Sequence, residues 1–567
     1  MPNGSKGSEP YRLNHPIDRR RFLRAATVGG VAGLAGCIGG DSDGGNGNGN
    51  GNGNGNGNGN GNGNGNGNGN GTGGGGSLTT VVGGELGGNL YPSDNLIIET
   101  VTANTLLYNS LVTRDPGTVE LVPDVAAEMP TVEGGQTFTF DLEEGVTFTD
   151  GTELIADDVK YSFEVLDEYD LTHNDLLYAP IDTIEIEDDY RIRFEHSEPN
   201  APWTGFLAIY FGLIQEGTAE EVDSFPQDLN NGPPEGAASG PFTLEEYQPQ
   251  SIATFAARDD YHEDGVPAAD EINIEVIPEP SSQRVALSEG NVDVLGSVTP
   301  KDYEPLLNED GITGDSKVNP MNRITIYMSH KPPFDNVHNR KAVSYAIDRQ
   351  GIIDNVHYGR GHTSSIPAPP DSWFYNEEAD VYGDRPQPDK VQEQLEMAGN
   401  PDGFSFTMKV SSQSPMTDTA TIIQQNLREV GIDVELEQVA PGSFYGFIAE
   451  QDYVAGLEYW NSILYPGYYM FQLFAQFGSY WGWTRWGEYE GTMEAGEEFT
   501  ETMREARKSP ERDHRAPLLK EAQQIFADES IFTLVGGVNT DQLWRDRVQN
   551  YEVMPSTWNN IRQVGIE

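Results

Sequence analysis

Short segments in which apolar and polar residues alternate recur along the chain after residue 78. Residues 137–142 read Thr-Phe-Thr-Phe-Asp-Leu, which gives a strand one apolar face. Residues 183–187 and 190–195 alternate in the same way on either side of Asp188-Asp189, a pattern typical of a β-hairpin. Further strands are predicted at residues 242–247, 252–257, 272–277, 324–328, 404–410 and 432–438.

Other segments repeat their apolar residues at helical spacing. Val159, Phe163 and Leu166 lie three or four residues apart, and Asp157 or Asp158 is suited to cap the helix that they define. Helices are also predicted at residues 99–108, 282–288, 340–347, 388–398 and 417–430, three of them ending near Gly290, Gly399 and Gly431. Because strands and helices alternate, the sequence predicts mixed α/β domains.

The first 37 residues have the pattern of an export signal. Three arginines at 19–21 are followed by Phe22-Leu23, a further basic residue and an apolar run of about a dozen residues, too short to span a membrane, which takes about 20. The paired arginines resemble a twin-arginine signal. Leu34-Ala35-Gly36-Cys37 resembles a lipobox, so Cys37 is predicted to carry lipid.

Residues 38–77 consist mostly of glycine and asparagine and contain too few apolar residues to fold, so we expect a disordered linker. A glycine-rich coil of about 40 residues has a root-mean-square length of roughly 35 Å. The linker is therefore long enough to hold a folded body away from a membrane. No later apolar run reaches spanning length.

The charge of the chain is strongly negative. It has 90 acidic and 34 basic residues and a formal charge of -56, and the predicted leader is itself basic. Such a surface excludes nucleic acid as a partner. The 36% hydrophobic and 10% aromatic content nevertheless indicates a packed core rather than disorder. We interpret the composition as that of a protein from an extreme halophile.

Candidate catalytic and metal chemistry is sparse. Cys37 is the only cysteine, which excludes a disulfide within the chain and a cysteine-rich metal site. The body contains none of the Gly-x-Ser-x-Gly, His-Glu-x-x-His or Ser-x-x-Lys motifs of hydrolases. We therefore expect no enzyme activity, no cofactor and no resident metal. A secreted hydrolase remains one alternative, and His357 with His362 leaves a nickel-complex binder as another.

A series of motifs resembles the peptide/nickel family of extracytoplasmic solute-binding proteins that serve ABC importers, known as family 5, whose ligands also include oligosaccharides. The likeness covers roughly residues 78–567. The motifs follow the family's order: Leu121–Ala126, Thr137–Phe140, Gly145–Gly151, Ala156–Val159, Ser239–Phe242, Ala286–Asp293, Asn339–Arg349 and Arg512–Asp528.

This resemblance implies a large type II two-lobed fold like that of periplasmic binding proteins, with an extra subdomain inserted in lobe I. Ligand is enclosed when the lobes close about a hinge. The expected partners are a small-molecule ligand, peptide or sugar, an ABC permease with its ATPase subunits, and the membrane through the lipid on Cys37; the expected state is a monomer outside the cytoplasm. The expected boundaries are 1–37 signal, 38–77 linker, 78–115, 236–319 and 536–567 lobe I, 116–235 insertion, and 320–535 lobe II.

Aromatic residues concentrate between 459 and 486, where four of the eight tryptophans lie. Tryptophan and tyrosine provide rigid apolar surface with a polar group, which suits a binding cleft. The segment coincides with the binding strand and loop that the resemblance implies. The predicted ligand-binding residues are Tyr91, Trp373, Tyr459, Trp460, Asn461, Ser462, Trp481, Trp483 and Arg485.

One position departs from the family's pattern. Peptide binders of the family place an aspartate four residues before the proline of this segment, where it pairs with the amino terminus of the peptide. Here Ser462 holds that position before Pro466. A buried ammonium without a charged partner is costly, so the ligand either lacks a free amine or is met by Glu450, Asp452 or Glu458. Arg485 is suited to hold a ligand carboxylate.

The charge predicts that the fold depends on salt. The Debye length falls from about 10 Å at 0.1 M salt to about 3 Å at 1 M, which removes most of the repulsion between surface carboxylates. We expect the protein to lose structure below about 1 M KCl. Thermal melting followed by circular dichroism between 0.1 M and 3 M KCl measures this, and equal melting temperatures across the series would refute it.

Overall fold

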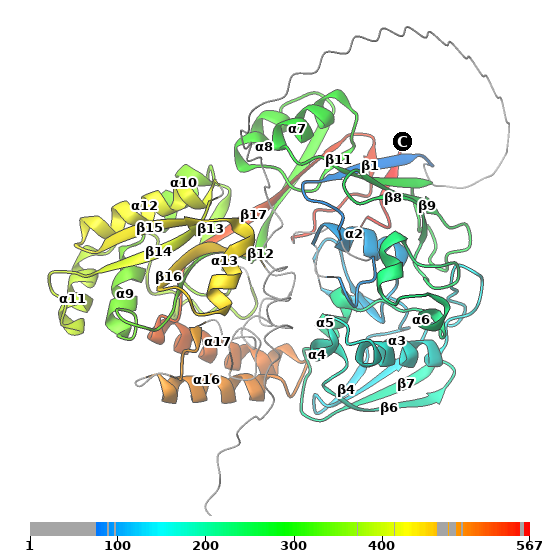
Figure 1. Ribbon diagram of the computed structural model, residues 1–567, viewed down its shortest axis with the longest axis horizontal. Coiled ribbons are helices and arrows are strands. Elements are labelled where there is room, and N and C mark those ends of the chain that lie inside the picture. Colours follow the sequence, from blue (N-terminus) through cyan, green and yellow to red (C-terminus); the bar gives the residue numbers. More distant parts are fainter. Residues whose placement is uncertain are drawn as a thin grey trace, which may run out of the picture.

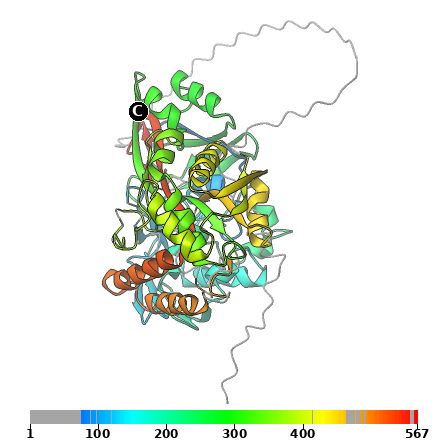
Figure 2. The ribbon, with the colours of Figure 1, turned by 90° about the vertical axis from the view of Figure 1, so that its left-hand side faces the viewer.

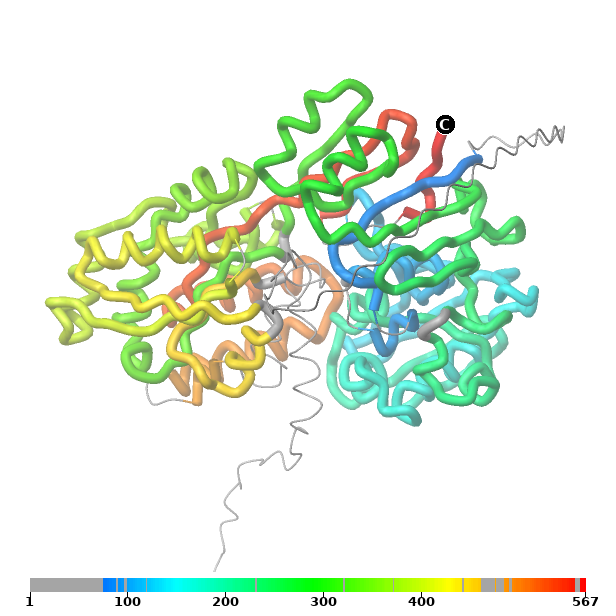
Figure 3. The backbone as a smooth tube through the Cα atoms, turned by 45° about the horizontal axis from the view of Figure 1, so that its top comes forward, coloured from blue at the N-terminus to red at the C-terminus, as the bar shows by residue number. Residues whose placement is uncertain are grey.

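The computed structural model describes residues 75–87, 90–95, 98–118, 120–370, 372–412, 414–461, 475, 484–488, 492–555 and 561–567. Two lobes lie side by side and are joined by long paired strands, which cross from one lobe to the other in Figures 1 and 3. Lobe II, the left half of Figure 1, is built mainly from residues 323–537, and lobe I contains the rest of the described chain.

An eleven-stranded sheet runs through both lobes. Its strands are β1 (Ser77–Val82), β8 (Phe242–Gln248), β9 (Ile252–Ala257), β10 (Glu271–Val276), β11 (Val294–Leu295), β12 (Ile312–Met328), β13 (Gly361–Thr363), β14 (Ser405–Ser411), β15 (Asp433–Val439), β16 (Ala455–Asn461) and β17 (Thr533–Arg545). The order is β15-β14-β16-β12-β17-β11-β1-β10-β9-β8, and β13 also pairs with β17. Consequently β12 and β17 are the strands that belong to both lobes.

The pairing of β12 with β17 is antiparallel and interrupted. Ile312–Val318 pair in register with 545–539, and after an irregularity the pairing resumes where Arg323 lies opposite Gly537. An interruption of this kind bends a strand and increases its local twist. It lies where the strands leave lobe I and enter lobe II, so it is positioned as a hinge.

Lobe II packs helices on a sheet whose strands β14, β15 and β16 run parallel. Its helices are α9 (Val337–Ala346), α10 (Arg349–Val356), α11 (Pro388–Ala398), α12 (Met416–Glu429), α13 (Pro441–Ala449), α16 (Met493–Ala506) and α17 (Arg512–Glu529). Ile324, Ile326, Leu457 and the apolar face of α12 form one buried core. In Figure 2, where lobe II faces the viewer, α16 and α17 lie side by side at its lower end.

Lobe I carries a second, smaller sheet of order β4-β5-β7-β6. The remaining elements of this lobe are α2 (Ile98–Leu107), β2 (Val112–Arg114), β3 (Leu121–Pro123), β4 (Thr131–Glu133), β5 (Thr137–Asp141), α3 (Ala156–Glu168), α4 (Asn174–Leu177), β6 (Ile181–Asp188), β7 (Arg191–His196), α5 (Trp203–Tyr210), α6 (Thr218–Glu221), the 3-10 helix η1 (Gln227–Asn231), α7 (Pro280–Glu289), α8 (Pro300–Leu307), β18 (Val548–Gln549) and β19 (Gly565–Ile566). The small sheet packs its apolar face on a buried Trp203, whose indole donates to the carbonyl of Leu177 at 2.8 Å.

The C-terminal segment returns to lobe I. The buried guanidinium of Arg562 donates to the carbonyls of Thr105 and Tyr108 and pairs with Asp124 at 2.8 Å. The small sheet lies within the segment predicted as an insertion, but the exact domain boundaries stay a prediction. None of the helices in the described ranges is long and apolar enough to cross a membrane. Cys37 and the predicted linker up to residue 74 lie outside the described residues.

Two details of the sequence prediction need correction. The helix near residue 157 begins at Ala156 after Ile155, so Asp157 and Asp158 lie in its first turn rather than at the cap. Asp158 still accepts a hydrogen bond from the amide of Ile155 at 2.9 Å, which satisfies one free donor of that end. The strand predicted at 324–328 is the end of the much longer β12.

Arg340 shows how positive charge is buried in this acidic chain. Its side chain on α9 is fully buried and donates to the carbonyls of Phe334 and Glu529, at 2.8 and 2.7 Å, and to the Glu529 carboxylate at 3.2 Å. Burial lowers the pKa of Arg340 to about 10, and the charge of Glu529 acts against that shift. The arginine therefore ties α9 to the end of α17.

Replacing Arg340 by methionine should destabilise the protein. Arg340→Met leaves two carbonyls and a partly buried carboxylate without their donor, so we expect the free energy of unfolding to fall by about 3 kcal/mol. Lys341→Met, the next residue of the same helix, is the control and should change it by less than about 0.5 kcal/mol. Urea unfolding in 3 M KCl measures both, and similar values for the two variants would contradict the assignment.

Candidate functional site

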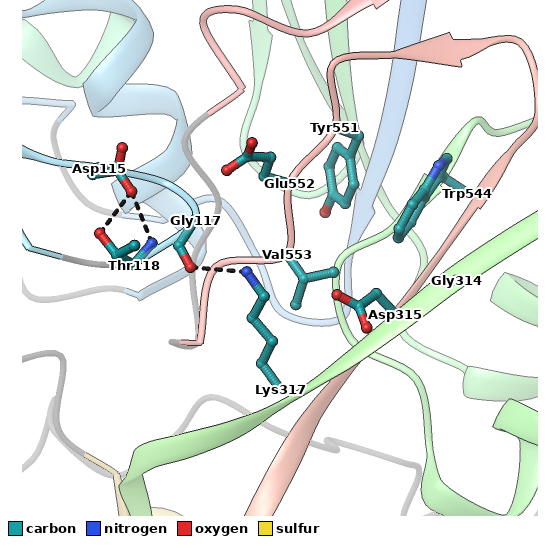
Figure 4. Close-up of a pocket in the computed structure, with 10 residues that line it drawn as sticks. All are labelled: Asp115, Gly117, Thr118, Gly314, Asp315, Lys317, Trp544, Tyr551, Glu552 and Val553. Carbon is teal, nitrogen blue, oxygen red and sulfur yellow. Dashed lines mark hydrogen bonds between the residues drawn. The ribbon is translucent and has the colours of Figure 1, made fainter. Parts of the chain in front are cut away.

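A cavity of about 520 Å³ lies on the lobe I side of the hinge, beside the first half of β12 and the end of β17. Three segments that are far apart in the sequence line it. They are the turn between β2 and β3, the first half of β12, and the chain from the end of β17 to residue 553. Figure 4 shows the lining residues: Asp115, Gly117, Thr118, Gly314, Asp315, Lys317, Trp544, Tyr551, Glu552 and Val553.

The alternation of β12 directs Asp315 and Lys317 to the cavity and Ser316 to the opposite face. The ammonium of Lys317 donates to the carbonyl of Gly117 at 2.8 Å and so fixes the β2–β3 turn against the hinge strand (Figure 4). Within that turn the Asp115 carboxylate accepts from the amide and the hydroxyl of Thr118, at 2.8 and 2.7 Å. The turn is thus held by its own hydrogen bonds and by the hinge.

Two aromatic rings form another side of the cavity. Trp544 and Tyr551 are half-buried, with ring centroids 4.8 Å apart and an interplanar angle of 47°. The Tyr551 hydroxyl donates to the Gln542 side chain at 3.1 Å, and burial raises the pKa of Tyr551. Together with three carboxylates and one ammonium, the rings offer apolar surface and hydrogen-bonding groups to a small polar solute.

The opposite face of the same strands carries an arginine clamp. Arg360, just before β13, binds both carboxylate oxygens of Asp541 in β17, at 2.6 and 2.8 Å. Ser316 donates to the same carboxylate at 2.6 Å. The guanidinium also lies 3.7 Å from the ring centroid of Tyr303 and pairs with Glu304 at 3.2 Å, both on α8. A lobe II loop is thereby fastened to lobe I at the hinge.

A second arginine lies inside the hinge. Arg323 is fully buried and opposite both Trp460 in β16 and Gly537 in β17. One of its terminal nitrogens is 3.0 Å from Nε2 of His362, and burial lowers the pKa of Arg323 to about 9. Burial and the neighbouring Arg323 charge lower the pKa of His362 to about 3, so the ring is neutral and its Nε2 accepts the hydrogen bond from Arg323.

Glycine is required at 537 for this packing. A Cβ atom there would lie 2.3 Å from Arg323 and 2.5 Å from His362. At this level the strands β16, β12, β17 and β13 lie next to one another, with Trp460, Arg323, Gly537 and His362 as paired neighbours. The backbone of Trp460 is therefore next to a buried guanidinium, while its side chain lies outside the described part of the structure.

Three of the predicted ligand-binding residues have described side chains in packed surroundings. Tyr91 is fully buried in lobe I, and its hydroxyl donates to the carbonyl of Gly212 at 3.1 Å, while its contact with a ligand stays a prediction. Trp373 is half-buried, with the guanidinium carbons of Arg512 and Arg515 each 5.6 Å from its ring centroid. Tyr459 packs against the core of lobe II.

The other predicted residues give less information. Arg485 is exposed and pairs with Glu488 at 2.9 Å, so its guanidinium is already engaged with a carboxylate of its own chain. Trp460 and Asn461 end β16, but their side chains lie outside the described residues. Ser462, Trp481 and Trp483 lie outside them entirely, and the proposed aromatic wall stays a prediction.

The three alternative carboxylates are placed differently. Glu450 and Asp452 are exposed beyond the end of α13, whereas Glu458 is buried in β16 and only two residues from Trp460. Burial raises the pKa of Glu458 to about 7, although the Tyr459 amide donates to its carboxylate at 2.8 Å. Within the described ranges no group of three His, Cys, Asp or Glu could hold a metal ion.

The cavity residues were not among the predicted site. Lys317, Trp544 and Tyr551 belong to segments without a recognisable motif and meet only when β12 pairs with β17. The one available signal was the scarcity of lysine in the chain, which makes a lysine in the middle of a polar strand unusual.

The sequence model described as "Bacterial extracellular solute-binding proteins, family 5 Middle" matches residues 120–481. The chain belongs to this family. Its members bind solutes for transport, so the protein is a solute-binding protein and not an enzyme, as predicted from the sequence. The two-lobed type II fold is likewise confirmed.

Several known proteins are similar over most of their length. The dipeptide-binding protein of Escherichia coli is 25% identical over 497 residues, covering 81% of this chain and 89% of its own. Heme-binding protein A of Haemophilus influenzae is 26% identical over 401 residues, which cover 65% of this chain and 72% of that protein. The structure of HbpA2 from Haemophilus parasuis has a TM-score of 0.74 at 22% identity, with 87% and 100% covered. The structure of AppA from Bacillus subtilis in complex with a nonapeptide has a TM-score of 0.71 at 21% identity, and the match covers 87% of this chain and 99% of that one.

The raised pKa of Glu458 predicts how stability depends on pH. An acid whose pKa is higher in the folded state than in the unfolded state stabilises the fold when it is protonated. Its contribution to the free energy of unfolding is therefore lost as pH rises from the unfolded pKa of about 4.5 to the folded pKa of about 7. We expect that loss to approach 3 kcal/mol, at about 1.4 kcal/mol per pH unit. Because glutamine does not ionise, Glu458→Gln should abolish this pH-dependent loss of stability.

Urea unfolding at pH 4.5, 6 and 8 in 3 M KCl measures this effect. Glu458→Gln should be more stable than the natural chain at pH 8, while the exposed Glu450→Gln control should follow the natural pH profile. A Glu458→Gln profile parallel to that of the natural chain would mean that this carboxyl ionises normally in the fold.

Proposed function

We propose that the protein captures a small solute between its lobes and delivers it to an ABC permease. Support comes from the family and from the two-lobed fold, and the cavity on the lobe I side of the hinge offers Trp544, Tyr551 and charged groups to a polar solute. We further propose that lipid on Cys37 holds the protein at the outer face of the cell membrane after export through the twin-arginine signal. The linker of residues 38–77 would then allow the body to reach the permease.

We propose an oligopeptide-like or oligosaccharide-like solute without a free amino terminus. Ser462 replaces the aspartate that the resemblance implies for an amine, and a neutral hydroxyl does not compensate a buried ammonium. The aromatic rings of the cavity offer apolar surface, and its polar groups can form hydrogen bonds with hydroxyl or amide groups. The relatives named above bind a dipeptide, heme or a nonapeptide, and this range fits a fold whose cleft accepts varied solutes.

Mass spectrometry of the small molecules that copurify with the protein tests the solute class directly. Calorimetry in 3 M KCl then compares an unmodified tripeptide, the same tripeptide acetylated at its amino terminus, and a trisaccharide. We expect the acetylated peptide or the trisaccharide to bind more tightly than the free peptide. Tightest binding of the free peptide would overturn the argument from Ser462.

The predicted aromatic wall is tested on whichever of these probes binds. Trp460→Ala should weaken its binding at least tenfold, because an indole in contact with a ligand contributes on the order of 1.4 kcal/mol or more. Tyr358→Ala removes an exposed aromatic side chain that lies outside the cavity lining and should leave the affinity unchanged. Unchanged affinity in Trp460→Ala would remove this residue from the site.

A further inference from the structure

The lobes also meet on the side of the molecule opposite the hinge. There the turn between α16 and α17, residues 507–511, reaches from lobe II to the small sheet of lobe I, close to α4, α5 and β4 in Figure 1. The amide of Ala201 in lobe I donates to the carbonyl of Arg507 in lobe II at 2.9 Å, and within lobe I the amide of the neighbouring Asn200 donates to the carbonyl of Gly135 at 2.6 Å. The main chains of the two lobes are therefore in direct contact.

At Gly135 the two lobes are so close that no side chain would fit between them. This glycine is in the β4–β5 turn with φ of 71°, and a Cβ atom on it would lie 2.5 Å from the carbonyl oxygen of Arg507 and 2.9 Å from that of Lys508. Its neighbour Gly134 has φ of 59°, but a Cβ there would meet nothing within 4 Å. Only the second glycine of the turn faces the other lobe.

Charge is distributed unequally across this contact. Residues 116–235, which include the small sheet, contain 29 acidic and three basic residues. The twelve residues from 504 to 515 contain five basic and three acidic residues, a net charge of +2 in a chain whose total is -56. Arg512 forms an ion pair with Glu120, and Glu198 raises the pKa of the largely buried Arg507 against the lowering by burial. A basic turn thus faces an acidic surface.

We propose that residues 504–515 form a latch that holds the cleft shut at its mouth and must break before solute leaves. Two acidic lobes repel each other when they close, and a concentrated basic segment on one of them offsets that repulsion where they meet. Trp373, next to Arg512 and Arg515, gives the latch an aromatic backing. The proposal rests on the proposed function, because it assigns the regulation of release to the same cleft.

The two glycines provide a matched pair of variants. Gly135→Ala places a methyl group against the Arg507 carbonyl, whereas Gly134→Ala imposes a comparable left-handed backbone strain without any contact. The distance between the lobes is measured without ligand, by spin labels on Asp182→Cys and Glu497→Cys in the full chain carrying Cys37→Ser. We expect Gly135→Ala to shift the distance distribution to longer values and Gly134→Ala to leave it unchanged.

Charge reversal tests the electrostatic part. Arg512→Glu should raise the ratio of open to closed molecules at least roughly threefold, and Glu120→Arg in the same chain should restore it. Lys520→Glu makes the same charge change on an exposed position of α17 and serves as the control. Equal distributions for both glycine variants, or for Arg512→Glu and Lys520→Glu, would overturn the latch. Because no ligand is used, solute binding by the probes above would still stand in that case.

Discussion

The interrupted pairing of β12 with β17 is the constraint on which the two-lobed structure depends. Its continuity up to Val318 fixes one half of each strand in lobe I, and its renewed pairing at Arg323 fixes the other half in lobe II. Gly537 allows the Arg323 guanidinium to lie across β17 and reach His362. One face of the same pair lines the cavity and the other carries the Arg360–Asp541 clamp, which joins a loop of lobe II to lobe I.

Several buried arginines in the described part of the chain donate most of their hydrogen bonds to main-chain carbonyl groups. Arg349 donates to the carbonyls of Leu534, Ser344 and Gly383, and Arg258 to those of four residues in lobe I. Hydrogen bonds inside the protein are screened little by salt. The expected salt dependence therefore arises from repulsion between surface carboxylates, and the interior contributes a part of the stability that salt leaves unchanged.

The sequence predicted the elements whose signals are local. Helices α7, α11 and α12 lie where helical spacing and the following glycines indicated, and the hairpin β6–β7 was clear from its alternation. The first half of β12 was missed because residues 312–322 contain glycine, asparagine, proline and charged residues without alternation, and only the partner strand β17 makes them extended. Trp544 and Lys317 were missed for the same reason, since their proximity is a product of strand pairing.

The β2–β3 turn connects the hinge, the cavity and the mouth of the cleft. At one side Lys317 holds the carbonyl of Gly117, and a few residues further along Glu120 pairs with Arg512 of the opposite lobe. Asp115 and Thr118 brace this turn internally through two hydrogen bonds. The segment that lines the cavity at Gly117 and Thr118 is thus only a few residues from Glu120, the residue of lobe I that pairs with Arg512 of lobe II.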